Sequence, residues 1–224
     1  MDYFNRQKSI ISSENQAKLK KTTVLVVGIG GLGTPVCQQL VRLGVGTLHL
    51  IDNGIIEATD LNRQFLYTTA DIGSSKVDIA RNNLLKIGLG TEIYVHNIKI
   101  GKDFTFDKEV DIVIDCLDNF QSRYYLDDYV QIKNIPMIYG GIYGMYGQIT
   151  TIIPKRTKSL RDLFDNVIPN IIDKIPVIAP IPSLVASIQV VEFVKFICGF
   201  DNTLVNRMYK IDLNEYITEI FDIA

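Results

Sequence analysis

Apolar residues fall into two kinds of run along the first two thirds of the chain. Strands are predicted by short, largely β-branched runs at residues 23–27, 47–51, 93–98, 110–116 and 136–139. Helices are predicted where apolar residues recur at helical spacing, after residue 33, at 74–87 and at 119–133. Repeated strand–helix units indicate an α/β fold, a Rossmann-like, doubly wound and mainly parallel sheet covered on both faces.

The pattern changes after Gly147. Further strands are predicted at 148–153, 207–213 and 216–223, and without crossover helices between them we expect antiparallel pairing. A proline-punctuated stretch and a core helix from Ser183 to Cys198, closed by Gly199, separate the first of these strands from the others. We expect a single domain, with a helical arm (1–21), a nucleotide-binding core (22–146) and a C-terminal part (147–224).

Composition narrows the classes of partner. A formal net charge of -2 gives no general electrostatic case for nucleic acid or an anionic membrane. The polar N-terminus has no apolar core of a secretory signal, so we expect a cytoplasmic protein. The cysteines are widely spaced, at Cys37, Cys116 and Cys198, which suits buried thiols in a reducing compartment. The sequence contains no Cys-x-x-Cys pair that would indicate a zinc site.

A glycine loop follows the first predicted strand and opens a helix. Gly28, Gly30 and Gly33 have G-x-G-x-x-G spacing, which lets the backbone approach phosphate at a helix N-terminus. Asp52 ends the next strand, where a carboxylate can accept ribose hydroxyls. The plainer interpretation is a tight turn of an α/β protein. The loop alone does not choose among NAD, FAD, S-adenosylmethionine and ATP.

Charged residues favour a triphosphate. Arg63, in Asp60-Leu61-Asn62-Arg63-Gln64, follows the second strand at the edge of the sheet that carries the glycine loop. Lys76 falls in the first turn of a predicted helix, where it opposes the helix dipole unless an anion binds there. A solvated lysine is the alternative.

The fourth predicted strand runs into Asp115-Cys116-Leu117-Asp118-Asn119 at the same edge. A carboxylate there suits Mg²⁺, which binds few protein carboxylates plus phosphate oxygens. We assign this role to Asp118 and a structural role to Asp115, with helix capping as the alternative for Asp118. His49 and His96 lie within strands and are interpreted as structural.

Together these residues resemble the ThiF/MoeB/HesA family, bacterial relatives of ubiquitin-activating enzymes, over almost the whole chain. Tyr3-Phe4-Asn5-Arg6-Gln7 is similar to the family's Arg-Tyr-x-Arg-Gln start. The glycine loop, Asp52, Asn62-Arg63-Gln64, Asp71-Ile72-Gly73 with Lys76, and Asp118-Asn119 with Arg123 follow in the family's order and spacing.

The resemblance implies an ATP-dependent adenylyltransferase that uses Mg²⁺ and works as a homodimer. Catalysis would then involve Arg63, Lys76, Asp118 and, reaching across from the other subunit, Arg6. Asp52 would hold the ribose, Asn62, Arg63 and Lys76 the phosphates, and Asp118 the metal. The implied nucleotide site comprises Gly28, Gly30, Gly31, Leu32, Gly33, Asp52, Asn62, Arg63, Gln64, Lys76, Leu117, Asp118, Asn119 and Arg123.

The chain departs from the family pattern in two places. Many members carry two Cys-x-x-Cys zinc pairs, yet residues 154–161 read Pro-Lys-Arg-Thr-Lys-Ser-Leu-Arg. Ile172 falls where the family's crossover cysteine would lie. We therefore expect no zinc, and the sequence does not support a covalent enzyme thioester or persulfide at that position.

Several functions fit these residues. The first is adenylation of the C-terminal glycine of a ubiquitin-like sulfur carrier, as in thiamine or molybdopterin biosynthesis, with Gly140-Gly141 guiding its tail. The second is adenylation of a small carboxylate, such as guanylylpyridinol in iron-guanylylpyridinol cofactor biosynthesis, or of a peptide C-terminus. An NAD-dependent oxidoreductase would leave Arg6, Arg63 and Lys76 unexplained. A non-catalytic scaffold would not need the cations and Asp118.

Overall fold

The computed structural model describes residues 2–167 and 176–224. The helices and short 3-10 turns are α1 (Asn5–Lys21), α2 (Gly33–Leu43), η1 (Ala58–Asp60), η2 (Thr69–Asp71), α3 (Lys76–Leu85), α4 (Phe120–Lys133), α5 (Leu160–Leu163) and α6 (Pro180–Cys198). The strands are β1 (Thr23–Val27), β2 (Thr47–Ile51), β3 (Glu92–His96), β4 (Ile112–Asp115), β5 (Met137–Tyr143), β6 (Tyr146–Ile152), β7 (Arg207–Asp212) and β8 (Ile217–Asp222).

All these strands join one sheet, in the order β3-β2-β1-β4-β5-β6-β7-β8. The pairs from β3 to β5 are parallel, and β6, β7 and β8 add antiparallel pairs. The predicted α/β class and the antiparallel C-terminal strands are therefore confirmed. The chain runs from β1 outward to β2 and β3, then crosses back to β4 on the other side of β1. This reversal creates a switch point between β1 and β4, where open α/β sheets bind ligands.

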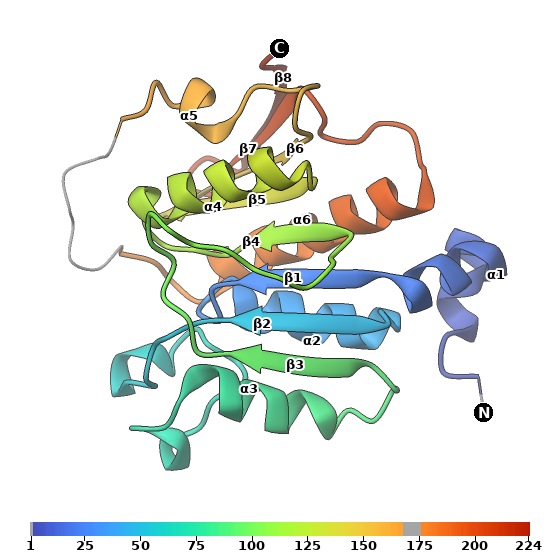
Figure 1. The fold of residues 1–224 in the computed structure, drawn as a ribbon, viewed down its shortest axis with the longest axis vertical. Coiled ribbons are helices and arrows are strands. Elements are labelled where there is room, and N and C mark those ends of the chain that lie inside the picture. Colours follow the sequence, from blue (N-terminus) through green and yellow to red (C-terminus); the bar gives the residue numbers. More distant parts are fainter. Residues whose placement is uncertain (1, 168–175) are drawn as a thin grey trace.

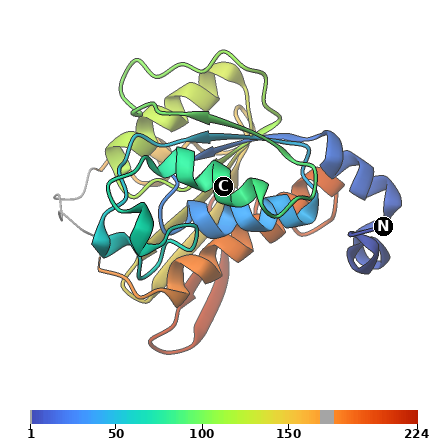
Figure 2. The same cartoon turned by 90° about the horizontal axis from the view of Figure 1, so that it is seen from below.

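Helices cover the sheet on both faces. In Figure 2, α2, α3 and α6 lie on one side of the sheet and α4 on the other. The larger core joins one face of β1 and β2 to α2, α3 and α6, for example through Val26, Leu40 and Phe193. A second core packs α4 on the opposite face, through Val113, Tyr124 and Tyr139. Apolar burial on both faces explains why the central strands are continuous apolar runs.

The structure corrects two predicted boundaries and shows a kink in the N-terminal arm. β5 continues through Gly140 and Gly141 to Tyr143, because it pairs antiparallel with β6 along its whole length. α6 begins at Pro180, earlier than the predicted Ser183, because prolines are tolerated in the first helical turn. The N-terminal arm is helical but kinked at Ser12, which has φ 72°.

Among the helices in the described part of the chain, α6 alone is long and apolar enough to span a membrane. Half of that apolar stretch is buried inside the fold. Its buried residues include Val185, Gln189 and Phe193, and it contacts α2, β5 and β6. It is the core helix that the sequence predicted. Cys37, Cys116 and Cys198 are buried free thiols, also as predicted.

Candidate functional site: a nucleotide cavity at the switch point

A cavity of about 590 Å³ opens at the carboxyl ends of β1, β2 and β4. In Figure 1 these strands all end on the side where the segment between β2 and α3 lies, with α1 on the other side. The lining combines glycines, apolar residues and both signs of charge: Gly28, Gly30, Gly31, Leu32, Ile51, Asp52, Asn53, Gly54, Ile55, Glu57, Asp60, Arg63, Gln64, Lys76, Ile98, Lys99, Ile100, Cys116, Leu117, Asp118, Asn119, Ser122, Arg123, Ile142 and Val177.

The glycine loop is built around close backbone contacts. Gly28 has φ 91°, and a Cβ there would lie 2.7 Å from the carbonyl oxygen of Cys116. A Cβ on Gly33 would meet the carbonyl of Gly28 itself. Both positions therefore require glycine, which lets the loop turn sharply into α2 and pack against the end of β4. Gly28, Gly30, Gly31 and Leu32 line the cavity, whereas Gly33 is not part of the lining.

Two side chains hold this loop in place. The Tyr67 hydroxyl is buried, 2.7 Å from the Ile29 carbonyl oxygen and 3.2 Å from the Lys76 carbonyl oxygen, so it bridges the loop and the start of α3. Burial raises the pKa of Tyr67, so the hydroxyl stays protonated and can donate. The Thr34 hydroxyl donates to the Gly30 carbonyl at 2.9 Å.

Asp52 is fixed by backbone donors at the end of β2. Its Oδ2 accepts from the N–H of Ile29 at 2.7 Å, and its Oδ1 accepts from the N–H of Gly54 at 2.6 Å. Each carboxylate oxygen keeps further acceptor capacity, which suits a pair of ribose hydroxyls. The sequence placed an acid here, and the structure shows what orients it.

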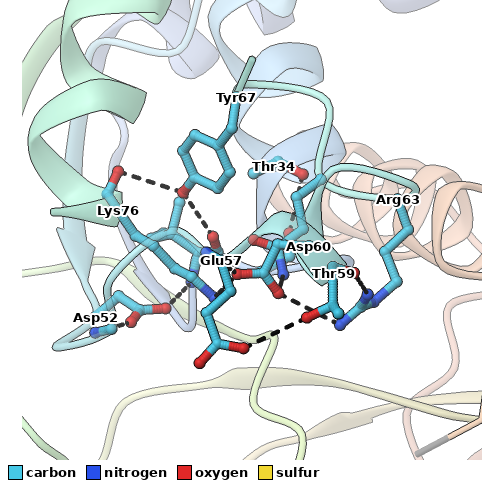
Figure 3. Close-up of polar contacts among 12 residues, drawn as sticks. Thr34, Asp52, Glu57, Thr59, Asp60, Arg63, Tyr67 and Lys76 are labelled. Atoms are coloured by element: carbon cyan, nitrogen blue, oxygen red, sulfur yellow. Dashed lines mark hydrogen bonds and ion pairs between the residues drawn. The ribbon is translucent and has the colours of Figure 1, made fainter. Parts of the chain in front are cut away.

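Asp60 forms ion pairs with two cations of the site, Lys76 and Arg63. Its Oδ2 lies 3.1 Å from Lys76 Nζ, and its Oδ1 lies 3.6 Å from Arg63 Nη2. Gln64 Nε2 donates to the same Oδ1 at 2.8 Å. Figure 3 shows Lys76 and Arg63 approaching Asp60 from opposite sides. Sequence reasoning gave Asp60 no role, although its spacing to Arg63 and Gln64 is the spacing of neighbours on a helical turn.

Lys76 is the first residue of α3, as predicted. Ser75 precedes it at the N-cap position but makes no side-chain capping bond. Two of the phosphate-binding candidates, Arg63 and Lys76, thus meet around one carboxylate, together with Gln64 of the implied nucleotide site. Asn62 is exposed, and its Oδ1 accepts from Arg63 Nη1 at 2.9 Å.

Asp118 lies across the switch point, on the loop after β4. It is exposed, lines the cavity and accepts a hydrogen bond from Asn119 Nδ2 at 3.2 Å. Asn119, not Asp118, caps α4, because its side chain accepts from the N–H of Ser122 at 2.9 Å. The Asp118 carboxylate is therefore not committed to a helix cap and suits a hard cation beside phosphate oxygens.

Arg123 borders the cavity but is engaged by the protein. Its Nη1 donates to Asp115 Oδ2 at 2.8 Å, and its Nη2 donates to the carbonyl of Leu117. Burial raises the pKa of the Asp115 carboxyl, while the Arg123 guanidinium and the N–H of Leu117 oppose that rise. The pair ties the loop that carries Asp118 to the end of β4, and Asp115 has the structural role expected from the sequence.

Cys116 also lines the cavity, next to the glycine loop. Burial raises the pKa of its thiol well above the usual range. A protonated thiol is a poor nucleophile, so this position does not favour covalent chemistry.

His49 and His96 lie outside the cavity lining and face each other at 3.0 Å between Nδ1 and Nε2. Phe106 meets both rings edge-on. The arrangement is structural, as interpreted from the sequence.

Arg6 lies far from this cavity within its own chain. It sits near the start of α1, and the neighbouring Gln7 donates to the carbonyl of Leu43, at the C-terminal end of α2. The glycine loop is at the other end of α2. An α-helix rises about 1.5 Å per residue, so the length of α2 separates the two. Ile172, the position of the expected crossover cysteine, lies outside the described residues.

The family model for the ThiF family matches residues 4–224. The chain belongs to the ThiF family. A Culex quinquefasciatus protein named adenylyltransferase and sulfurtransferase MOCS3 is 35% identical over 211 residues, covering 91% of this chain and 48% of its own length. The sulfur carrier protein adenylyltransferase of Thermus thermophilus is 29% identical over 229 residues, covering 96% of this chain and 84% of that protein.

Solved structures share the fold of this ThiF-family chain. Escherichia coli MccB in complex with a MccA variant has a TM-score of 0.88 at 23% identity, covering 100% of this chain and 72% of MccB. PaaA has a TM-score of 0.85 at 24% identity, and the match covers 99% of this chain and 82% of PaaA. The chain spans about half the length of several curated relatives that it matches, 48% and 54% of two of them.

Proposed function

We propose that this protein is an ATP-dependent adenylyltransferase that transfers AMP to a carboxylate and releases pyrophosphate. The observation that carries the proposal is the placement of Lys76 and Arg63 beside the glycine loop, in the cavity that Asp118 also lines. Membership of a family whose relatives are named adenylyltransferases supports it. A dinucleotide-dependent oxidoreductase would use the glycine loop and Asp52 but has no need of these charges.

The donor set fits ATP with Mg²⁺. The glycine loop presents backbone without side chains, and Asp52 presents carboxylate oxygens to the ribose. Lys76 and Arg63 would hold phosphate oxygens, with Asn62 and Gln64 beside them. Asp118 would hold Mg²⁺, which supplies charge neutralisation on the phosphates. Leu117, Asn119 and Arg123 shape the loop that presents Asp118.

The chemistry requires little from the protein beyond position and charge. A substrate carboxylate is ionised at neutral pH, because its pKa is about 4, so its attack on the α-phosphorus needs no general base. A bond forms between the carboxylate oxygen and the α-phosphorus while the bond from the α-phosphorus to the bridging oxygen breaks. Pyrophosphate takes the electron pair. Lys76 and Arg63 stabilise the charge that develops on it.

The charge of the cavity supports a homodimer. Its described lining holds four carboxylates, Asp52, Glu57, Asp60 and Asp118, and four cations, Arg63, Lys76, Lys99 and Arg123. The lining is therefore formally neutral, and a triphosphate needs added positive charge. We propose that Arg6 of a second copy supplies part of it, since Arg6 cannot reach the cavity of its own chain.

Complementation tests this arrangement. Arg6→Ala and Lys76→Ala proteins, each inactive alone, should regain activity when mixed under conditions that allow subunits to exchange, because a mixed dimer keeps one intact site. Recovery of up to about a quarter of the wild-type rate is expected from random pairing. Absence of recovery, with dimer exchange demonstrated, would place Arg6 outside the site.

We propose the C-terminal glycine of a small sulfur carrier as the carboxylate, because the Thermus thermophilus relative is named for that substrate. A small-molecule carboxylate or a peptide C-terminus is the second candidate, because residues 154–161, where many family members carry their first zinc pair, contain no cysteine. Incubation with ATP, Mg²⁺ and each class of carboxylate, followed by mass spectrometry of the adenylated product, separates them. We place this reaction in the cytoplasm, where ATP is available.

A further inference from the structure

Asp60 occupies an unusual place for a carboxylate, inside a cavity that must bind polyphosphate. Its side chain is 9% exposed and lies between Lys76 and Arg63, whose side chains are 14% and 25% exposed. Glu57, in contrast, is an exposed acid at the rim. A buried acid next to the phosphate-binding cations repels the phosphates, so its presence calls for a compensating role.

The contacts of Asp60 suggest what that role is. Besides Lys76 and Arg63, it accepts from Gln64 Nε2 at 2.8 Å and from the N–H of Glu57 at 3.0 Å. It is therefore fixed to the backbone of its own turn through Glu57 and connects this turn to α3 through Lys76. The cations that it holds are flexible side chains that would otherwise lose conformational freedom when they bind a ligand.

We propose that Asp60 is a positioning residue, which orders Lys76 and Arg63 in advance of nucleotide binding and limits the affinity of the site for free polyphosphate. Lys76 has three N–H donors, so holding one of them at Asp60 leaves others for phosphate oxygens. Two cations against one carboxylate leave one net positive charge in the cluster. The site thus gains order at the expense of electrostatic attraction, which favours release of pyrophosphate after the transfer.

The inference rests on the proposed adenylation, and the two are tested separately. Asp60→Asn keeps the shape of the side chain but removes its charge. Pyrophosphate binding, measured by calorimetry, should become severalfold tighter because the cluster gains one positive charge. The kcat for adenylation should fall at least about tenfold, because one neutral amide oxygen replaces the carboxylate that Lys76 and Arg63 share. The pyrophosphate affinity is measurable even if no carboxylate substrate is known.

Asp128→Asn is the matched control. It removes an ion pair of similar type, Asp128 with Arg161 at 2.7 Å, on α4 and α5. This variant should leave pyrophosphate affinity and kcat unchanged. Thermal unfolding of both variants establishes that they are folded.

Opposite movement of affinity and kcat in Asp60→Asn supports the positioning role, since general damage to the site would weaken both. Weaker pyrophosphate binding in folded Asp60→Asn, or an unchanged kcat, would overturn it. Absence of adenylation in the wild type with every class of carboxylate would instead contradict the proposed function, while the binding result would still decide whether Asp60 limits polyphosphate affinity.

Discussion

Arg123 and Asp115 form a buried ion pair behind the cavity, 2.8 Å between Nη1 and Oδ2, with Arg123 stacked over the ring of Tyr139 at 4.8 Å. Arg123 therefore supports the Asp118 loop from behind. We propose this supporting role for it in place of direct phosphate binding.

Removing one partner should expose that role. Arg123→Met leaves the Asp115 carboxylate buried without its cation, and we expect a loss of about 3–5 kcal/mol in the free energy of unfolding by urea. The double variant with Asp115→Asn should recover much of this loss, because the uncompensated charge is gone. A stable Arg123→Met protein that has lost ATP binding would instead identify Arg123 as a ligand for the nucleotide.

The Tyr67 hydroxyl should contribute to both stability and binding. Tyr67→Phe leaves the Ile29 carbonyl without its 2.7 Å donor, so we expect a loss of about 1–3 kcal/mol in unfolding free energy. ATP affinity should fall with it, because Ile29 lies in the glycine loop. Tyr94→Phe removes an exposed hydroxyl that contacts Glu92, and it should change stability by less than about 0.5 kcal/mol. Equal effects of the two variants would contradict the assignment.

A comparison of Gly28 with Gly73 tests the close contact between the glycine loop and the backbone of Cys116. Both have φ near 90°, but a Cβ on Gly73 meets nothing within 4 Å, whereas on Gly28 it lies 2.7 Å from the Cys116 oxygen. Gly73→Ala should cost about 1–2 kcal/mol from backbone conformation alone. Gly28→Ala should cost roughly 1–3 kcal/mol more because of the overlap. Equal costs in denaturant titrations would mean that the contact relaxes freely.

The lowered pKa of His49 should make the stability of the fold depend on pH. Burial, with added repulsion from His96 and Lys108, lowers its pKa from 6.5 to about 4. Between these values the unfolded chain binds more protons than the folded one, so this group makes stability fall as pH falls from about 6.5 to about 4. Burial raises the pKa of Asp127 to about 6, which acts in the opposite direction over an overlapping range.

The contribution of His49 is therefore measured by difference. Tm as a function of pH should decline less steeply below pH 6.5 in His49→Gln than in the wild type, because Asp127 is unchanged in both. Parallel curves would show that His49 titrates normally in the folded protein.

The sequence was informative wherever a role depends on local pattern. Gly28, Gly33 and Asp52 could be assigned because a strand, a tight turn and a helix follow one another within a short segment. Lys76 could be placed at a helix start for the same reason. The extension of β5 through Gly140 and Gly141 could not be predicted, because it depends on antiparallel pairing with β6. Glycines normally weaken a strand, and here Gly140 gives room to the Gln189 side chain.

Ion pairs between side chains far apart in the sequence could not be predicted either. Asp60 contacts Lys76 sixteen positions later, and nothing in the residue types distinguishes this acid from an exposed one such as Glu57. Arg123 was expected in the nucleotide site, and it does line the cavity, but its ion pair with Asp115 could not be predicted. Charged residues at one edge of a sheet can be predicted from topology. Which of them neutralise one another is decided by the tertiary packing.

Pyrophosphate exchange into ATP tests the central claim most directly. With labelled pyrophosphate, ATP and Mg²⁺, exchange in the wild type should depend on addition of the cognate carboxylate, since the reaction reverses only through an acyl adenylate. Lys76→Ala and Asp118→Ala should lower that exchange at least about a hundredfold, as expected for loss of groups that stabilise developing charge. Exchange at wild-type rates in both variants would contradict the assigned site. Binding of NAD without binding of ATP would contradict adenylation itself.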